Sequence, residues 1–414
     1  MSSKTRIRVF EHQRLKKGDI VDDVEFTEKH FQALEKYYGD IGCDYFSLIH
    51  NGIKFNQFVG VLQIGNLTIE VLPKADKGTE DKDLWHGLLI DMLRKAGILD
   101  VATTGFASLR LKSNSIFHLY LELFLHEASY LLHRGLIKKY RKIDGNLLAM
   151  KGSIVFPKQV AYNAIHAERF YVRYTTYDKN NLLNKILYKT LRLIRNINTS
   201  PLLQADIESL LIDFPDCNDI IATDTLFDKI VFDRKTEAYK KAINMARLLL
   251  LNYHPDIRRG GYDVLALMFN MNDLWEVYVF KLLKKKLENN FRCRDQVKTD
   301  FWKPVAGKIK KIIPDIVVSD LNDKSVAIVD TKWKNQRGSS PADDDLKQMF
   351  AYNIYNHCMN STLVYPTSEY DFVKGEFVKS EFGYCSLTLV ALNNTNGKME
   401  PDLDPLVKWI ENLS

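Results

Sequence analysis

The chain has 414 residues, 46% of them hydrophobic, and a formal net charge of +6 at pH 7. This length and composition indicate a globular protein that buries a sizeable core, in two or three domains rather than one. They exclude a transmembrane protein, because no run approaches the roughly 18 consecutive apolar residues that cross a bilayer. The first residues also lack the apolar segment of a secretion signal, so we expect a cytoplasmic chain with no membrane partner.

The first predicted region, residues 1–82, is a small mixed α/β segment. Residues 61–71 alternate around Gly65 and Asn66, which predicts two strands joined by a tight turn. A proline and the charged stretch KADKGTEDKD follow, and together they are typical of a domain boundary.

The second predicted region, residues 83–260, is mostly helical. Apolar residues recur on one face of four segments, which predicts amphipathic helices. These segments are residues 84–97, 115–136, 181–197 and 237–253. We expect one short strand-like interruption, KGSIVFPK, at residues 151–158.

One of these helices contains three potential metal ligands. His118, Glu122 and His126 lie at steps of four, so one helical face could present all three. However, residues 119–121 and 123–125 are all apolar or aromatic, and the spacing is not H-E-x-x-H. We therefore expect a buried helix here rather than a metal site.

The third predicted region, residues 261–414, has the pattern helix, strands, helix, two strands and helix from about residue 265. This order predicts a compact mixed sheet flanked by helices. The predicted fold class is therefore a multidomain α+β or α/β protein.

Positive charge concentrates early in this third region. Residues 281–311 hold eleven Lys or Arg and three acids, a local charge of +8 that exceeds the charge of the whole chain. A solvated helix face followed by a loop would give the same pattern. Because the run precedes two acidic strands, we also expect phosphate contacts that position a polyanion. The candidate DNA-binding residues are Lys284, Lys285, Lys286, Lys308, Lys310, Lys311 and, beyond the run, Lys334.

Residues 311–334, KIIPDIVVSDLNDKSVAIVDTKWK, combine two apolar strands with three charges. The β-branched residues predict the strands, and DLND predicts the turn of an antiparallel hairpin. With a two-residue turn at Asn322-Asp323, or with a four-residue loop, Asp315 lies directly opposite Asp330. Lys332 follows Asp330 by two positions and therefore projects on the same face.

Two opposed carboxylates repel each other unless a cation binds between them. Hard oxygen ligands suit Mg²⁺, with Mn²⁺ as the alternative, and such an ion binds phosphate oxygens and activates water. Asp315 and Asp330 are therefore the candidate metal ligands. Lys332 is the candidate catalytic lysine, which would orient the water and offset charge on the phosphate. A surface hairpin with a chance Asp opposite an Asp–Lys pair would show the same residues without such a site.

The elements PD and DTK of this hairpin resemble the P-D…(D/E)-x-K signature of restriction-endonuclease-like nucleases. Downstream, Gln348 and Tyr352 lie one helical turn apart and are similar to the Q-x-x-x-Y element of several DNA-cleaving branches of that superfamily. We expect their helix to begin with Ser340 as its cap and Pro341 at its first position. Glu276 lies in the first helix of the region, where related nucleases often contribute an acid near the metal.

The complete pattern resembles McrC, the nuclease subunit of the McrBC modified-cytosine-dependent restriction system. The segments that carry the resemblance from about residue 84 onward are AMKGSIVFPKQV, YDKNNLLNKILYKTL, IVDTKWKN and STLVYPTSE. Ser153 stands where the first of these segments usually has Arg. FVGVLQIGNLTIEVLPK, nearer the N-terminus, is similar to a segment of the longer members.

The resemblance implies a Mg²⁺-dependent DNA endonuclease that cuts only with McrB, an AAA+ GTPase hexamer that carries the DNA-recognition domain. The chain fits this division of labour, since it has no G-x-x-x-x-G-K-[ST] phosphate loop. Its first part, up to about residue 253, would dock on the GTPase and stimulate GTP hydrolysis. The implied catalytic residues are Asp315, Asp330, Lys332, Gln348 and Tyr352, with Asp315, Asp330 and Glu276 as the metal ligands.

Two alternatives stay open. The first is a nuclease of DNA repair or of another defence system, although the five scattered cysteines, with no C-x-x-C pair, argue against an iron–sulfur cluster. The second is an assembly factor that activates an NTPase and has lost nuclease activity. The complete set of two acids and a lysine disfavours this second alternative.

Overall fold

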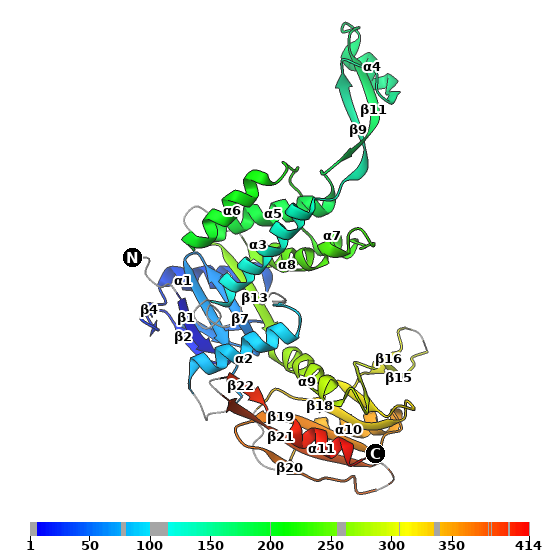
Figure 1. The fold of residues 1–414 in the computed structure, drawn as a ribbon. Coiled ribbons are helices and arrows are strands. Elements are labelled where there is room, and N and C mark those ends of the chain that lie inside the picture. The colour runs from blue at the N-terminus through cyan, green and yellow to red at the C-terminus, as the bar shows by residue number, and fades with distance from the viewer. Residues whose placement is uncertain are drawn as a thin grey trace. The chain divides into compact units, whose positions relative to one another are not determined.

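The computed structural model divides into two compact units, Met1–Phe117 with His254–Ser414, and His118–Tyr253 (Figure 1). It describes residues 6–75, 80–99, 115–198, 200–254, 262–305, 307–334, 340–379, 381, 383–395 and 398–413. The units divide the chain differently from the three consecutive regions expected from the sequence, because the first and third of these share one unit. No helix in the described part of the chain is long and apolar enough to cross a membrane.

The first unit contains a five-stranded sheet with the strand order β1-β8-β7-β13-β12. Its strands are β1 (Arg6–Phe10), β7 (Phe58–Ile64), β8 (Leu67–Leu72), β12 (Tyr253–His254, whose first residue belongs to the second unit) and β13 (Val264–Asn270). β1 is parallel to β8, and β13 is antiparallel to β7. The sheet thus combines strands that the sequence assigned to different regions.

The hairpin predicted around Gly65 is confirmed by β7 and β8, in which Ile64 pairs with Leu67. Gly65 has a φ of 53°, and a Cβ at this position would lie 2.4 Å from the ring of Tyr262. The turn therefore needs glycine both for its left-handed backbone and for the space beside it.

Short strands and two helices complete this part of the unit. They are β2 (Arg14–Lys16), β3 (Ile20–Val21), β4 (Val24–Glu25), α1 (Glu28–Ile41), β5 (Phe46–Ile49), β6 (Gly52–Phe55) and α2 (Lys82–Lys95). Helix α2 begins two residues before the predicted start, because the Asp81 carboxylate accepts hydrogen bonds from the backbone N–H groups of Asp83 and Leu84. Apolar side chains of α1 and the sheet strands, among them Leu34, Ile7 and Ile69, form one buried core.

The second unit contains most of the predicted helices. They are α3 (Ile116–Arg134, whose first two residues belong to the first unit), α5 (Leu182–Ile197), α6 (Pro201–Asp213), α7 (Asp224–Asp228), the 3₁₀ helix η1 (Glu237–Tyr239) and α8 (Lys240–Leu251). The helices predicted at residues 115–136, 181–197 and 237–253 are thus confirmed. Helix α5 buries Ile186, Leu187 and Ile194 on one face, as its periodicity predicts.

A β-arm extends from these helices within the second unit (Figure 1). It consists of β9 (Lys139–Leu147), β10 (Ser153–Ile154), α4 (Phe156–Asn163) and β11 (Phe170–Asp178). β9 and β11 pair antiparallel along their whole length. The short strand predicted within residues 151–158 is confirmed as β10, but it pairs with β11 in a three-stranded ribbon whose longer strands, β9 and β11, were not predicted. The ribbon buries only Val172 among its strand residues, so its strands lack the apolar alternation that identifies a half-buried strand.

The rest of the first unit is a seven-stranded mixed sheet with helices and a small hairpin. The sheet order is β14-β17-β18-β19-β21-β20, and β22 pairs with β21. The strands are β14 (Arg292–Asp295), β17 (Ile316–Ser319), β18 (Ser325–Thr331), β19 (Asn360–Thr367), β20 (Asp371–Val373), β21 (Tyr384–Thr395) and β22 (Lys398–Pro401). The remaining elements are α9 (Met271–Leu287), β15 (Thr299–Trp302), β16 (Lys310–Ile312), α10 (Asp343–Tyr355) and α11 (Asp404–Glu411).

Strand β18 is central in this sheet, antiparallel to β17 and parallel to β19. Helix α10 packs Met349 and Tyr352 into a core with Ile328 of β18 and Leu363 of β19. The order of elements follows the predicted pattern from α9 onward, but residues 264–270 form strand β13 before this helix, and four strands rather than the predicted two lie between α10 and α11. Asp330 thus lies in a central buried strand next to a helix.

Candidate active site

The predicted antiparallel hairpin is formed by β17 and β18, in which Ile316 pairs with Val329. The same register carried one residue further places Asp315 opposite Asp330. The predicted two-residue turn at Asn322-Asp323 is wrong, because Asp320 N–H donates to the carbonyl of Lys324 and encloses a longer loop. A register shift between Val318 and Ser319 compensates for the different turn, so the opposition of the acids is kept.

Asp315 is fixed by the residue that follows Asp330. Its Oδ2 accepts hydrogen bonds from the backbone N–H of Thr331, at 2.7 Å, and from the Thr331 hydroxyl, at 2.9 Å. Burial raises the pKa of Asp315, and these two hydrogen bonds act against that rise. The threonine inside the DTK element therefore has a role in the site that the sequence did not reveal.

Asp330 has no exposed surface, since β18 is an inner strand of the sheet and helices α9 and α10 pack against it. Neither of its carboxylate oxygens has a hydrogen bond of normal geometry, although Lys332 Nζ lies 2.7 Å from Oδ2. Burial, and then repulsion from Asp315, raises the pKa of Asp330 to about 7. A buried carboxylate without hydrogen-bond donors is costly unless another positive group binds it.

Lys332 joins Asp330 to helix α10. Its Nζ lies beside Asp330 and also donates to Gln348 Oε1 at 3.1 Å. Burial disfavours the ammonium form, but attraction to Asp330 outweighs burial and raises the pKa of Lys332. The ammonium is therefore held in place by partners from two different elements.

The predicted pair Gln348 and Tyr352 lies on the side of α10 that faces Lys332. Gln348 Nε2 donates to the Tyr352 hydroxyl at 2.6 Å, and that hydroxyl donates to the carbonyl of Ile313 at 2.9 Å. The helix start was predicted wrongly: α10 begins at Asp343 with Ala342 as its cap residue, not with Ser340. Three successive aspartates, Asp343 to Asp345, occupy the first turn, where the helix dipole favours negative charge.

Glu276 lies on α9 and belongs to the same electrostatic environment. Burial, and then repulsion from Asp315, raises the pKa of Glu276 to about 7, while a hydrogen bond from Gln296 Nε2 at 3.2 Å acts against the rise. Gln296 also donates its backbone N–H to the carbonyl of Asp315, from a left-handed backbone with a φ of 46°. No pattern in the sequence indicates this glutamine.

Of the three acids predicted as metal ligands, two are arranged so that they could hold a divalent cation. Asp315 and Asp330 are opposed, Asp330 is fully buried and Asp315 is partly buried, and neither Asp330 oxygen has a hydrogen bond of normal geometry, which is the arrangement that a hard cation would stabilise. Among the described residues, however, no three His, Cys, Asp or Glu side chains form a metal-binding group. The structure therefore does not bring Glu276 into one cluster with the two aspartates, and Asp315 and Asp330 are the residues that could hold a metal.

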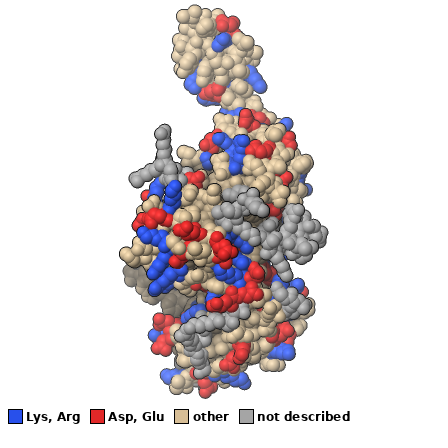
Figure 2. All heavy atoms as spheres, turned by 90° about the vertical axis from the view of Figure 1, so that its left-hand side faces the viewer, with Lys and Arg blue, Asp and Glu red and all other residues tan. Residues whose placement is uncertain are grey.

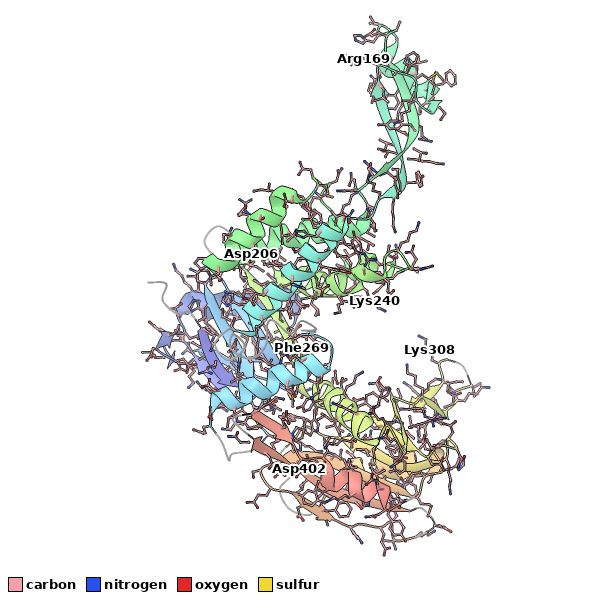
Figure 3. The ribbon with its side chains drawn as sticks, viewed as in Figure 1. Arg169, Asp206, Lys240, Phe269, Lys308 and Asp402 are labelled. Atoms are coloured by element: carbon pink, nitrogen blue, oxygen red, sulfur yellow. The ribbon has the colours of Figure 1, made fainter. Side chains whose placement is uncertain are left out.

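The candidate DNA-binding lysines come from separate elements. Lys284, Lys285 and Lys286 form the last turn of α9, and Lys308, Lys310 and Lys311 belong to the hairpin of β15 and β16, where Figure 3 labels Lys308. Three of the predicted lysines pair with acids. These pairs are Lys286 with Asp404, Lys311 with Asp300 and Lys334 with Asp345. Figure 2 likewise shows basic and acidic side chains interspersed on the face that it draws.

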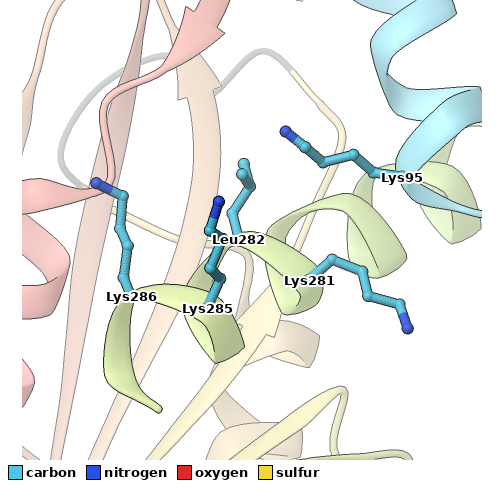
Figure 4. Close-up of a pocket in the computed structure, with 5 residues that line it drawn as sticks. All are labelled: Lys95, Lys281, Leu282, Lys285 and Lys286. Carbon is cyan, nitrogen blue, oxygen red and sulfur yellow. The ribbon is translucent and has the colours of Figure 1, made fainter. Parts of the chain in front are cut away.

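Helix α9 also lines a hollow with helix α2 (Figure 4). Lys281, Leu282, Lys285 and Lys286 of α9 surround a volume of about 460 Å³ together with Lys95 of α2. The sequence did not reveal Lys95 as a member of this group, because 186 residues separate it from Lys281. Two of the four ammonium groups already pair with acids, Lys95 with Asp91 and Lys286 with Asp404, so the hollow is basic but partly neutralised.

Two solved structures resemble this fold. A half-complex from the tetradecameric assembly of Thermococcus gammatolerans McrB AAA+ hexamers with bound McrC contains a chain with a TM-score of 0.68 and 19% identity, over 99% of each chain. The cryo-EM structure of the Thermococcus gammatolerans McrBC complex contains a match with a TM-score of 0.50 and 21% identity, over 68% of this chain and 88% of the other. No curated protein matches the chain.

The family model described as "McrBC 5-methylcytosine restriction system component" matches residues 53–366. The chain belongs to the McrBC family. The matched range of this McrBC-family chain extends from β6 into β19, and so includes α9, the β17–β18 hairpin and α10. The predicted family and the predicted multidomain α+β fold are thereby confirmed.

Proposed function

We propose that this McrBC-family subunit is the DNA endonuclease of its restriction complex and that it hydrolyses phosphodiester bonds with Mg²⁺, or alternatively Mn²⁺. The observation that carries the proposal is the carboxylate of Asp330, which is fully buried without a hydrogen bond of normal geometry to either oxygen, and which lies opposite Asp315 and 2.7 Å from the Lys332 ammonium. Burying a charged group in this way lowers the stability of the fold, so its presence favours a functional role. It supports metal-dependent hydrolysis at this point of the sheet.

In this proposal each residue has a separate role. Asp315 and Asp330 hold the metal, and the metal, when bound, activates water and polarises the phosphate. Thr331 keeps Asp315 in position through its two hydrogen bonds. Lys332 orients the attacking water and offsets negative charge on the phosphate, while Gln348 and Tyr352 hold Lys332 against the helix.

The lysines of α9 and of the β15–β16 hairpin would bind the DNA backbone. Phosphate contacts of this kind give affinity and orientation without reading bases. The hollow between α2 and α9 adds Lys95 to the proposed phosphate-binding surface. Sequence specificity would then reside in the partner.

The proposed partner is an AAA+ GTPase hexamer of the McrB type. The chain itself lacks a phosphate loop, and a similar fold occurs in an assembly of McrB AAA+ hexamers with bound McrC. The second unit exposes apolar side chains that support partner docking there. On the β-arm and α4 they include Tyr140, Leu148, Met150, Phe156, Val160, Tyr162, Ile165 and Tyr177. Docking would stimulate GTP hydrolysis.

The test uses the full chain with the AAA+ GTPase encoded beside it, GTP, Mg²⁺ and methylated DNA. We expect DNA cleavage and faster GTP hydrolysis with the wild type. With Asp330→Ala we expect the same stimulation of GTP hydrolysis and no cleavage. Cleavage by Asp330→Ala would contradict the nuclease assignment, and a wild type that neither binds nor stimulates the GTPase would contradict the partner.

A further inference from the structure

A second buried acid, Glu11, lies outside the catalytic residues. It directly follows β1, and its backbone N–H donates to the carbonyl of Leu72. The side chain is only 6% exposed, and its Oε1 accepts hydrogen bonds from the indole Nε1 of Trp333, at 2.6 Å, and from the backbone N–H of Lys74, at 2.9 Å. Glu11 and Trp333 are 322 residues apart in the chain.

The residue that Glu11 binds is the immediate neighbour of Lys332. Trp333 lies beyond the end of β18 and is only 7% exposed. Its backbone N–H donates to Asn272 Oδ1 at 3.3 Å, and its ring makes an edge contact with Trp275 of α9, with 5.3 Å between ring centres. On the other side, Lys332 N–H donates to the carbonyl of Val364 at 2.9 Å.

These contacts hold the segment that carries Lys332 where it leaves the sheet. In an extended chain, successive side chains point to opposite sides, so Trp333 points away from the face on which Lys332 meets Asp330. An anchor on Trp333 therefore fixes the backbone from behind without touching the reacting groups. Burying a carboxylate for this purpose is costly, since Glu11 Oε2 is buried without a hydrogen-bond partner and has only His12 Nε2 at 3.8 Å.

We propose that Glu11 is a positioning residue, which holds the Trp333 indole and thereby sets the place of the Lys332 ammonium relative to Asp330 and Gln348. The inference rests on the proposed nuclease function. It assigns to the N-terminal sheet a direct part in the nuclease site, because the carboxylate comes from the end of β1. A displacement of the reacting groups by about 1 Å lowers the rate on the order of 100-fold, so an anchor that prevents such a displacement preserves the rate.

The test combines hydrogen exchange with cleavage kinetics on the full chain. In Glu11→Ala and in Trp333→Phe, which keeps a ring but loses the indole donor, we expect faster exchange of the amides of Lys332 and Trp333. In complex with the GTPase partner, both variants should lower kcat for DNA cleavage by about tenfold to 100-fold with unchanged KM. Glu11→Gln keeps an oxygen acceptor and should retain most of the rate. The double variant should be no slower than the slower single variant.

Thr68→Val is the matched control. It removes a buried hydrogen bond from the Thr68 hydroxyl to Gln63 Oε1 in the same sheet, without any link to Trp333. Unchanged amide exchange in Glu11→Ala and Trp333→Phe would overturn the proposal, and so would a loss of kcat no greater than that of Thr68→Val. A wild-type complex that cuts no DNA would contradict the nuclease function instead, and the exchange data would still decide whether Glu11 anchors the segment.

Discussion

The β17–β18 hairpin and the β9–β11 arm are both antiparallel pairs that place an aspartate beside a cation. The pKa of the aspartate, however, shifts in opposite directions in the two. In the arm, Asp144 accepts hydrogen bonds from Arg173 Nε and Nη2 at 2.7 and 2.9 Å, and these bonds lower its pKa to about 2. In the hairpin, burial raises the pKa of Asp330 to about 7 despite Lys332 at 2.7 Å. An adjacent cation alone therefore does not determine the charge state of an aspartate, because access to water has the larger effect.

The comparison separates a solvated ion pair at a surface from a buried pair at the proposed active site. Strand β9 has no fully buried residue, so both charges of the Asp144–Arg173 pair keep water around them. Strand β18 buries its last five residues, including Asp330. We therefore expect only the buried pair to gain from binding a further cation.

The largest expected effect is the loss of DNA cleavage in variants of the candidate site residues. Asp315→Ala, Asp330→Ala and Lys332→Ala should each lower DNA cleavage by about 10²- to 10⁴-fold, because each removes a group that the proposed mechanism places at the reacting phosphate. Cleavage assays with partner, GTP and Mg²⁺ measure this. The matched control is Asp323→Asn at the tip of the same hairpin, whose carboxylate pairs with Arg292 in solvent. A variant that cuts as fast as this control does not carry a catalytic group.

Metal affinity should distinguish the same two aspartate environments. We expect calorimetric titration with Mg²⁺ or Mn²⁺ to show binding to the wild type and to Asp144→Asn. Binding should be lost in the Asp315→Asn, Asp330→Asn double variant, because the opposed carboxylates supply the oxygens. Equal affinity in the double variant and the wild type would place the metal elsewhere.

The pH dependence of stability should have opposite signs for the two aspartates. Between pH 4 and pH 7 the folded protein keeps a proton on Asp330 that the unfolded chain has already lost, so the free energy of unfolding falls as pH rises. In a buffer with chelator, Asp330→Asn should therefore flatten the decline of the melting temperature from pH 5 to pH 8. Asp144 contributes stability that is lost only as pH falls toward about 2, so Asp144→Asn should leave that decline unchanged. An equal decline in both variants would show that Asp330 is not the buried acid responsible.

The smallest effect concerns solvated lysines. Replacing Lys281, Lys285, Lys308 and Lys310 by Gln should weaken binding to every DNA sequence and reduce the salt dependence, by about 0.9 in log–log slope for each phosphate that is no longer neutralised. Lys311→Gln is the control, because Asp300 already lies 2.9 Å from the Lys311 ammonium. DNA affinity measured across a series of salt concentrations checks this. An unchanged slope of log affinity against log salt concentration in the fourfold variant would show that these lysines do not contact phosphates.

Several features of the site could be predicted because they depend on residues close in the sequence. The alternation of strand side chains places Asp330 and Lys332 on one face, and the helical repeat places Gln348 and Tyr352 one turn apart. The prediction that Asp315 lies opposite Asp330 did not depend on the exact length of the hairpin loop. The register shift after Val318 keeps the two residues opposite each other. The β-arm was missed for the converse reason, because a ribbon that buries almost nothing has no periodic pattern to detect.

The sequence by itself therefore determined the family, the strand pair and the identity of the charged residues, since backbone geometry fixes which nearby side chains share a face. Only the tertiary structure decided how those charges behave. The burial of Asp330 depends on helices α9 and α10, which pack against β18, and the anchor on Trp333 depends on Glu11, 322 residues away. Likewise, β13 pairs with β7 and Lys95 joins the lysines of α9 only after folding. Solvent exclusion and contacts between distant residues arise from the packing of the whole chain, which no local pattern specifies.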